Sequence, residues 1–296
     1  KWKKFMHAEI PVLRIVNGLF YRAQLKKMSR LEREAIYAEG IKRLHEKIKL
    51  LKMHPQVKFS DFGNRRSFSA PWHEFVVARI TEELPDQFMG TSNTKLAMEY
   101  NQMAIGTCAH ELSMIFAALQ FDGTNESLKK SFVTLHENWW EKYGHGLSIF
   151  LPDTFGTNYA LSILPYDMIK DWKGSRIDSM DPIACGNLWI FEYQRRGIDP
   201  RQKMIIPSDG LDVPSMIKIT QEFMNRIKVS HGIGTKLTND LGLKQLSIVV
   251  KPHSANGKPC VKLSDNIAKA MGEPEAVEAY KKAVGYNVTE NKACEV

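Results

Sequence analysis

The sequence is poor in cysteine and contains no arrangement of cysteines that is typical of a disulfide framework or a structural metal site. Its four cysteines, Cys108, Cys185, Cys260 and Cys294, form no C-x-x-C pair. Such isolated cysteines are typical of free thiols in a reducing compartment. We therefore expect a cytoplasmic protein.

Long hydrophobic runs are also missing. The most apolar early segment, residues 10–21, is interrupted by Arg14 and Asn17 and is too short to span a bilayer. Because no signal-peptide pattern occurs either, we expect no membrane partner. The sequence begins at Lys1 instead of a methionine, in the middle of a pattern, and we expect that an N-terminal piece is missing.

Several familiar catalytic motifs are absent. His110-Glu111 begins an H-E-x-x-H zinc motif, but Met114 stands at the second histidine position. Gly232-x-Gly234 lacks the third glycine of a dinucleotide fingerprint, and neither a P-loop nor a G-x-S-x-G motif occurs. The sequence therefore disfavours a zinc protease, a Rossmann-type enzyme, a P-loop enzyme and a serine hydrolase.

The sequence carries an excess of positive charge. The sequence has 41 Lys and Arg against 33 Asp and Glu, a net charge of +8, which favours anionic partners such as nucleic acids or phosphorylated small molecules. Its aromatic residues are not interleaved with the basic ones as in single-strand binding platforms, so we expect no nucleic-acid partner. The Arg65-Arg66 pair and Arg176 instead lie beside strand-to-loop junctions, where a small-molecule site would form.

A unit of strand, polar loop and helix recurs about seven times between residues 57 and 239. This alternation predicts an α/β fold with parallel strands, as an α/β barrel or an open doubly wound sheet, and modestly favours the barrel. A buried helix over residues 10–22 should precede it. Beyond residue 250, Asn256-Gly257 predicts an antiparallel hairpin, followed by a helix over residues 274–284.

The stretch from Ile105 to Leu112 is the most informative loop. A glycine and Thr107 lead into an apolar helix over residues 112–119, with His110 in its first turn. A helix start suits an anion, Thr107 is placed to cap the helix or bind a ligand, and His110 can shuttle a proton or accept a transferred group. The alternative is a capped core helix with a structural histidine.

Other strand ends carry groups that suit a phosphate and a ribose. Gly234 and Thr235 lie in a glycine turn whose N–H groups can face a phosphate, although an ordinary turn is the alternative. Asp178 and Asp209 suit ribose hydroxyls or hydrated Mg²⁺, unless they are helix N-caps. Arginines such as Arg176 suit a carboxylate, an aromatic ring or a pyrophosphate, unless they form surface ion pairs.

These loops resemble those of the nicotinate phosphoribosyltransferases, within the type II phosphoribosyltransferases. The resemblance runs from about residue 10 to residue 263. It rests on seven segments in the family's order: Asp61-Phe62-Gly63-x-Arg65-Arg66-x-Phe68-Ser69, Gly90-Thr91-Ser92-Asn93, Ile105-Gly106-Thr107-x-Ala109-His110-Glu111, Asp153-Thr154-Phe155-Gly156-Thr157, Arg176-Ile177-Asp178-Ser179, Ser208-Asp209-x-Leu211-Asp212 and Gly232-Ile233-Gly234-Thr235-x-Leu237-Thr238-Asn239-Asp240.

The resemblance implies an irregular α/β barrel over residues 12–245. Residues 1–11 and 246–296 would be parts of an adjoining α+β open-faced sandwich domain whose N-terminal segment is absent. The implied reaction converts nicotinate and phosphoribosyl pyrophosphate to nicotinate mononucleotide and pyrophosphate, in NAD biosynthesis. It is coupled to ATP hydrolysis, with ATP and phosphoribosyl pyrophosphate as co-substrates.

The resemblance also implies a role for each loop residue. By motif position, His110 is the histidine that ATP phosphorylates, Thr107 and Arg176 contact nicotinate, Phe62 stacks on its ring, and Arg65 lies nearby. Asp178, Ser208 and Asp209 handle the ribose and its Mg²⁺, which is held mainly through the substrate, while Gly234 and Thr235 hold the 5′-phosphate. Homodimerisation is also implied.

Two residues bear on the substrate. Related nicotinamide-using enzymes carry an aspartate in the loop of Ser92, and a serine here favours the carboxylate of nicotinate because it carries no repelling charge. The family usually has glycine where this chain has Met180, which puts the geometry of that loop in doubt because methionine restricts the backbone. The alternatives are therefore a nicotinamide phosphoribosyltransferase and a non-catalytic binding protein on the same scaffold.

Overall fold

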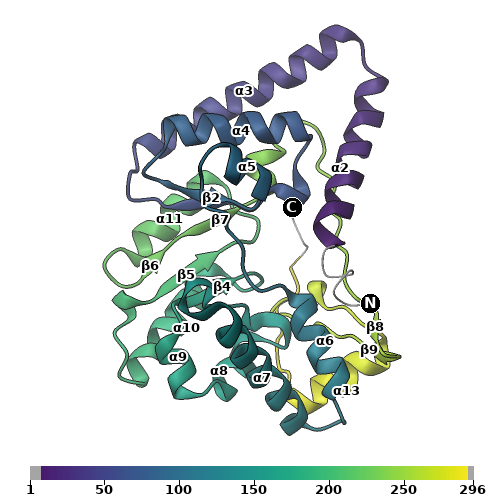
Figure 1. Cartoon of the computed structure of the whole chain (residues 1–296), viewed down its shortest axis with the longest axis vertical. Coiled ribbons are helices and arrows are strands. Elements are labelled where there is room, and N and C mark those ends of the chain that lie inside the picture. Colours follow the sequence, from purple (N-terminus) through teal and green to yellow (C-terminus); the bar gives the residue numbers. More distant parts are fainter. Residues whose placement is uncertain (1–7, 293–296) are drawn as a thin grey trace.

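The computed structural model describes residues 8–292 as an α/β fold in which helices surround two parallel sheets (Figure 1). One sheet has the order β2-β1-β7, and the other has the order β3-β4-β5-β6. Every pairing within them is parallel. The strands are β1 (Phe59–Asp61), β2 (Phe88–Thr91), β3 (Ile149–Phe150), β4 (Gly174–Ile177), β5 (Met204–Pro207), β6 (Lys228–Val229) and β7 (His231–Ile233). The predicted parallel α/β architecture is confirmed.

The two sheets follow one another through Ser230, which separates β6 from β7. The Ser230 N–H donates to the Ile205 carbonyl of one sheet at 3.1 Å, and the His231 N–H donates to Lys58 just before the other at 2.9 Å. The chain therefore crosses between the sheets within one residue. Across residues 8–292 the parallel strands form these two adjoining sheets, and no pairing between strands closes them into one ring.

Helices connect the strands from β1 to β6, as the alternation predicts, and a short helix follows β7. Polar N-caps begin several of them: Ser69 caps α4, Asp181 caps α10 and Asp212 caps α11. These helices are α4 (Ala70–Glu83), α5 (Thr94–Glu99), α6 (His110–Gln120), α7 (Asn125–Tyr143), α8 (Thr157–Ile163), α9 (Tyr166–Asp171), α10 (Pro182–Arg195), α11 (Val213–Phe223) and α12 (Thr235–Thr238). Aromatic side chains fill the core between the helices and the sheets. The Phe150 ring stacks on the Trp172 ring, with 4.0 Å between their centroids.

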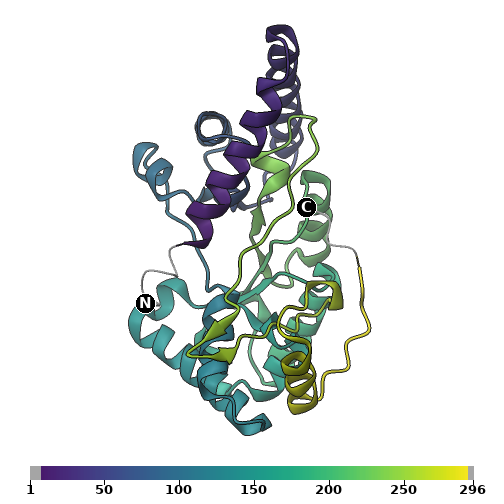
Figure 2. The ribbon, with the colours of Figure 1, turned by 90° about the vertical axis from the view of Figure 1, so that its right-hand side faces the viewer.

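The first two described helices, α2 (Glu9–Lys26) and α3 (Arg30–Lys52), diverge from a tip that projects from the molecule and form a V-shaped arm (Figures 1 and 2). The prediction of a buried helix over residues 10–22 is wrong in one respect. Only Leu13, Asn17 and Tyr21 of α2 are buried, because the arm packs along a single face. The other apolar side chains, including Ile15 at 60% exposure, remain accessible.

The tail folds back against α6, which its hairpin contacts (Figure 1). The predicted hairpin is confirmed as β8 (Ser254–Ala255) and β9 (Lys258–Pro259), and the predicted helix as α13 (Pro274–Val284). The Leu263 N–H donates to the Thr154 carbonyl at 2.7 Å, so the tail reaches the strand ends. The domain boundaries stay a prediction, and residues 1–7 and Cys294 lie outside the described part.

Cys108, Cys185 and Cys260 are buried free thiols. Among the described helices, none combines the length and apolar character needed to cross a bilayer.

Candidate active site

Every residue that the sequence analysis assigned to substrate or catalysis lines one cavity, whose volume is about 570 Å³. Most of these residues follow the carboxyl ends of β1, β2, β4, β5 and β7, where α/β folds build their sites. They are Phe62, Arg65, Ser92, Thr107, His110, Arg176, Asp178, Ser208, Asp209, Gly234 and Thr235. These residues therefore lie together at one cavity, and the role of each residue stays a prediction.

Arg176, near the end of β4, joins three of these loops. Its Nε donates to the Ser208 hydroxyl at 2.8 Å and its Nη1 donates to the Thr107 hydroxyl at 3.1 Å. Its Nη2 pairs with Asp178, and the guanidinium lies 5.6 Å from the centroid of the Phe62 ring. A fixed positive charge beside an aromatic face suits a flat, negatively charged ring.

His110 begins α6 and is almost fully buried at the cavity wall. Its Nδ1 lies 3.0 Å from the Thr154 hydroxyl and its Nε2 lies 3.0 Å from Asp178 Oδ2. Burial lowers the pKa of His110 and the carboxylates of Asp153 and Asp178 only partly offset this, so the imidazole is neutral at pH 7. Of the two roles considered for Thr107, the helix cap is not realised, because no described side chain caps α6, and ligand binding stays a prediction.

The helices after β4 and β5 are capped by aspartates that lie outside the cavity. Asp181 and Asp212 are the N-caps of α10 and α11, so Asp178 and Asp209 are not caps. Burial would raise the pKa of Asp178, but the Arg176 guanidinium and His110 hold it well below its usual value. Asp178 is therefore an anion throughout the physiological pH range.

Lysines of the tail were missed by the sequence analysis. Lys269 donates to Asp209 Oδ2 at 2.5 Å and to the Asp178 carbonyl at 2.8 Å. Lys262 lies 3.9 Å from Asp153 and is almost fully buried, and both lysines line the cavity. They extend the positive charge of the site, although no motif around them marks them out.

Arg65 is already paired within the chain. Its Nη1 contacts Glu9 of α2, and Glu9 also accepts from Lys251 at 3.2 Å. Lys251 Nζ in turn lies 3.4 Å from Glu111, the neighbour of the candidate histidine. Burial opposes ionisation of Glu9, but Glu111, Lys251 and Arg65 lower its pKa to about 2. Glu9 was also missed, and it neutralises Arg65.

A fully buried cluster beneath the cavity fixes two of the loops. Asp61 accepts from the Gly63 N–H at 2.6 Å, from the Thr91 hydroxyl at 2.5 Å and from His73 Nε2 at 2.6 Å. The Asp61 carbonyl accepts from the Ser92 N–H at 2.7 Å. This cluster therefore ties the loop after β1 to the loop after β2.

Glycine is required where β7 passes beneath Phe62. A Cβ on Gly232 would lie 2.6 Å from carbons of the Phe62 ring, so any side chain there would displace the ring. Met180 causes no comparable conflict, because its φ is not positive and its side chain packs on the main core. The loop after β4 thus accepts methionine without backbone strain.

One cluster of side chains at the cavity wall has the composition of a metal site. Ligand atoms of His110, Asp153 and Asp178 lie within 4.8 Å of one another. The 3.0 Å contact between His110 and Asp178 is a hydrogen bond, and the Lys262 ammonium lies 3.9 Å from Asp153. These contacts favour a hydrogen-bonded group around His110 over a metal centre.

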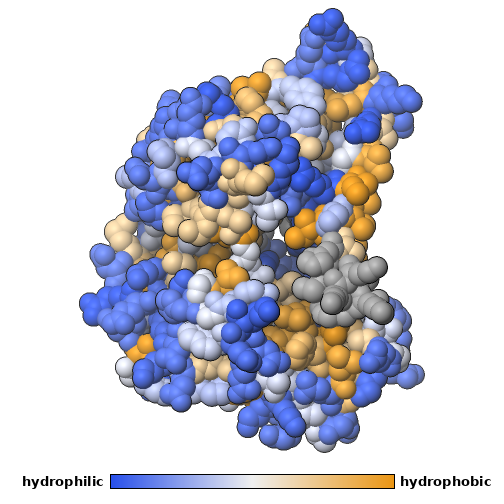
Figure 3. Space-filling model, viewed as in Figure 1, coloured by the Kyte–Doolittle hydropathy of each residue, from blue (hydrophilic) through white to orange (hydrophobic). Residues whose placement is uncertain are grey.

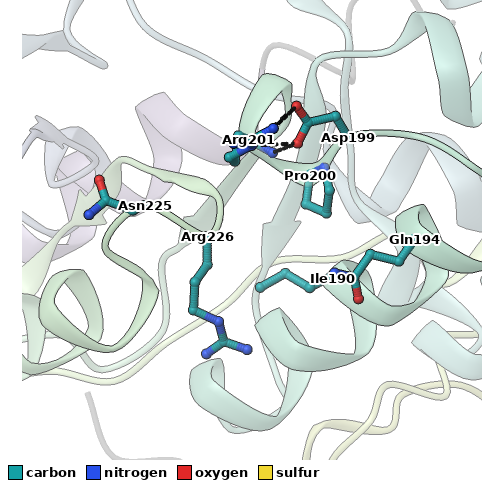
Figure 4. Close-up of a pocket in the computed structure, with 7 residues that line it drawn as sticks. All are labelled: Ile190, Gln194, Asp199, Pro200, Arg201, Asn225 and Arg226. Carbon is teal, nitrogen blue, oxygen red and sulfur yellow. Dashed lines mark hydrogen bonds and ion pairs between the residues drawn. The ribbon is translucent and has the colours of Figure 1, made fainter.

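A second depression, of about 400 Å³, lies beside the segments that precede β5 and β6, at the amino ends of these strands (Figure 4). Its charges are already paired: Arg201 binds Asp199 through two nitrogens, and Arg226 binds Glu222 at 2.9 Å. Because parallel α/β folds build sites at the carboxyl ends, the larger cavity is the candidate site.

Comparisons with known proteins agree with this geometry. The model of the nicotinate phosphoribosyltransferase (NAPRTase) family matches residues 57–290. Among solved structures, a nicotinate phosphoribosyltransferase from Porphyromonas gingivalis is similar, with 29% identity, a TM-score of 0.82 and coverage of 94% of this chain and 70% of that chain. One from Vibrio cholerae has 30% identity, a TM-score of 0.84 and coverage of 94% and 67%. A putative nicotinate phosphoribosyltransferase from Saccharomyces cerevisiae has 25% identity, a TM-score of 0.79 and coverage of 94% and 68%.

The chain belongs to the nicotinate phosphoribosyltransferase family.

Proposed function

We propose that this chain converts nicotinate and phosphoribosyl pyrophosphate to nicotinate mononucleotide and pyrophosphate, and that it couples the reaction to ATP hydrolysis through a phosphohistidine at His110. Membership of the family supports a phosphoribosyl transfer with small-molecule substrates. The coupling to ATP is a further step, which depends on the environment of one histidine.

The arrangement of Arg176 is the observation that carries the proposal. Its guanidinium is held by Thr107 and Ser208 and faces the Phe62 ring at 5.6 Å. A pyridine ring on Phe62 would place its carboxylate near this fixed cation. When the ring nitrogen is held toward the sugar site, its attack on the anomeric carbon no longer requires a bimolecular encounter, which lowers the entropic part of the barrier.

In the transfer, the pyridine nitrogen forms a bond to the anomeric carbon while the bond from that carbon to the pyrophosphate oxygen breaks. The ribose passes through an oxocarbenium-like state, which the Asp178 carboxylate stabilises. Pyrophosphate leaves with growing negative charge, and Lys262 and Lys269 line the cavity where that charge develops. Gly234 and Thr235 hold the 5′-phosphate.

His110 is suited to accept a phosphoryl group because it is neutral at pH 7. Its ring nitrogen attacks the γ-phosphorus of ATP, ADP leaves, and water later hydrolyses the phosphohistidine. Asp178 and Thr154 orient the ring at 3.0 Å each. The new negative charge then lies beside Asp178 and the tail lysines, so its formation and loss can bias the loops around the substrates.

Mg²⁺ fits this site as a water-mediated partner. Asp178 uses both oxygens, for Arg176 and Ser208 on one and His110 on the other. Asp209 is 47% exposed and uses one oxygen for Lys269, which leaves the other to accept from a hydrated ion. When bound, Mg²⁺ neutralises charge on the pyrophosphate.

Nicotinate is favoured over nicotinamide by the loop after β2. Ser92 lines the cavity, and its hydroxyl accepts from the Asn64 N–H at 3.3 Å. A neutral side chain at this position does not repel the carboxylate of nicotinate, whereas a carboxylate would.

Homodimerisation and a cytoplasmic location complete the proposal. Apolar side chains gather along the exposed face of α2 (Figure 3), namely Ile10, Val12, Ile15, Val16 and Leu19, which supports an interface between subunits. The buried free thiols of Cys108, Cys185 and Cys260 support a reducing compartment.

The test is product formation by the purified chain. Nicotinate, phosphoribosyl pyrophosphate and Mg²⁺ are incubated with and without ATP, and nicotinate mononucleotide is measured by chromatography, with nicotinamide in a parallel reaction. We expect product from nicotinate and a faster reaction with ATP. Product from nicotinamide alone would point to the sister activity, and no product from either pyridine would contradict an enzymatic role.

A further inference from the structure

Two adjacent arginines after β1 line the same cavity but have opposite surroundings. Arg65 pairs with Glu9 of α2. The Nη1 of Arg66 is buried and has no hydrogen-bond partner within residues 8–292, and no described carboxylate oxygen lies within 4.0 Å of the Arg66 guanidinium. Arg66 is thus the guanidinium in this loop that the protein leaves without an anion.

Arg66 is half-buried, and a guanidinium nitrogen that is buried without a partner is unfavourable, because it has lost its water and gained no hydrogen bond in return. Burial and the neighbouring Arg65 lower the pKa of Arg66, while Asp178, Asp209 and Glu9 raise it from a distance. The guanidinium keeps its charge nonetheless. Such a group facing a cavity is typical of a site that an anionic ligand completes.

The backbone around Arg66 shows which part of the cavity it serves. The Arg66 carbonyl accepts from Asn239 Nδ2 at 2.9 Å, and the Gly63 carbonyl accepts from the Thr238 hydroxyl at 3.3 Å. The loop of Arg66 is therefore tied to the segment that begins at Gly234 and Thr235. The tail lysines, in contrast, contact carboxylates on the side of β4 and β5, since Lys269 binds Asp209 and Lys262 lies near Asp153.

We propose that Arg66 is a phosphate-binding residue, whose guanidinium contacts the 5′-phosphate of the phosphoribosyl substrate beside Gly234 and Thr235. This assignment rests on the proposed function, which supplies the phosphorylated sugar. The planar guanidinium of Arg66 offers two parallel N–H donors to phosphate oxygens, and Nη1 would gain the acceptor that it lacks.

The first measurement is calorimetric binding of two separate probes, ribose 5-phosphate and inorganic pyrophosphate, to the full chain. In Arg66→Gln we expect ribose 5-phosphate to bind at least about tenfold more weakly, because a charge-assisted pair is lost, and pyrophosphate to bind within about twofold of the wild type. Arg66→Lys keeps the charge but loses the paired N–H donors of the guanidinium. Its affinity for ribose 5-phosphate should lie between those of the wild type and Arg66→Gln.

Two control variants separate this site from general charge. Arg30→Gln removes one positive charge from an exposed ion pair on the arm and should leave both affinities unchanged. Arg79→Gln removes one positive charge from an ion pair with Glu82 on α4, outside the cavity, and should likewise leave both affinities unchanged.

Thermal unfolding without ligand distinguishes a ligand-binding arginine from a structural one. Loss of a structural arginine would lower the Tm. Removing an unpaired buried cation relieves its desolvation cost, so Arg66→Gln should raise the Tm by about 2 °C. Ribose 5-phosphate should raise the Tm of the wild type more than that of Arg66→Gln. Stability and binding should therefore change in opposite directions.

Several results would overturn the assignment. If Arg66→Gln binds ribose 5-phosphate with wild-type affinity, Arg66 does not contact the 5′-phosphate. The same conclusion follows if the variant loses affinity for pyrophosphate and keeps its affinity for ribose 5-phosphate. A lower Tm together with lost binding would make Arg66 a structural residue. If the wild type makes nicotinate mononucleotide and the variant data go against Arg66, only this inference fails. If the wild type neither makes product nor binds ribose 5-phosphate, the proposed function fails with it.

Discussion

The buried carboxylate of Asp61 supports the loops that carry Phe62 and Ser92, and its removal as a charge is the most informative perturbation. In Asp61→Asn, one oxygen can still accept from the Gly63 N–H, which donates at 2.6 Å in the wild type. The other position becomes an NH₂ group. It would face two donors, His73 Nε2 at 2.6 Å and the Thr91 hydroxyl at 2.5 Å.

The magnitude follows from these contacts. Each hydrogen bond to a charged group contributes about 1.5–3 kcal/mol, and part of that is recovered because the variant no longer buries a charge. We expect a net loss of about 2–3 kcal/mol in the free energy of unfolding. With an unfolding entropy of about 2.1 cal/mol/K per residue, the Tm of this 296-residue chain should fall by about 3–5 °C.

The pH dependence of this difference has a definite sign. Burial alone would raise the pKa of Asp61, but His73, Thr91 and the Gly63 N–H bring it below its usual value. The carboxylate is therefore more acidic in the folded chain than in the unfolded one. Its stabilisation is present above about pH 4 and is lost as the pH falls, so the two proteins should converge in acid.

The assay is urea unfolding at pH 7 and at lower pH, together with nicotinate kinetics. We expect the KM for nicotinate to rise about tenfold, since two loops of its pocket shift, while phosphorylation of His110 changes less. Thr91→Val removes one of the bonds and Thr91→Ser restores the hydroxyl as its matched control. An unfolding free energy of Asp61→Asn within about 0.5 kcal/mol of the wild type would refute the reasoning.

Three further predictions follow from single contacts. Gly232→Ala should raise the KM for nicotinate about tenfold in steady-state assays, because its Cβ would lie 2.6 Å from the Phe62 ring. Ser92→Asp should lower kcat/KM for nicotinate at least about tenfold and shift preference toward nicotinamide, by repulsion of the carboxylate. Since Lys262 lowers the pKa of His110, Lys262→Met should move the acid limb of the phosphorylation rate against pH upward.

A glycine substitution far from atoms of other residues serves as the control for Gly232→Ala, and each prediction has a result that would contradict it. Gly18→Ala places a Cβ with no atom within 4 Å in a helix interior, so it should leave the KM unchanged and stabilise the chain by up to about 1 kcal/mol. An unchanged KM in Gly232→Ala, an unchanged preference in Ser92→Asp, or an acid limb that stays in place or moves downward in Lys262→Met would contradict the corresponding contact.

Much of the fold could be predicted from the sequence because its signals are local. The alternation of strand, loop and helix indicated parallel strands, and Asn256-Gly257 adopts the positive φ values, 50° and 75°, that its hairpin needs. The exposure of α2 could not be predicted in this way. Its apolar residues follow a helical pattern whether they face this chain or another surface, so Ile15 looked like a core residue.

The candidate site shows the same division. Groups that follow strands, such as Asp178 and Asp209, could be placed together because parallel strands bring their carboxyl ends to one edge. Glu9 and Lys262 could not. Each reaches the cavity from a segment distant in sequence, and a single charged residue in such a segment carries no local signal of its destination.

The most direct test of the account is a crystal structure of the chain with nicotinate mononucleotide bound. We expect the pyridine ring on Phe62 with its carboxylate toward Arg176, and the phosphate beside Gly234 and Thr235. A mononucleotide bound outside the cavity at the carboxyl ends of the strands, or reversed so that its phosphate meets Arg176, would contradict it.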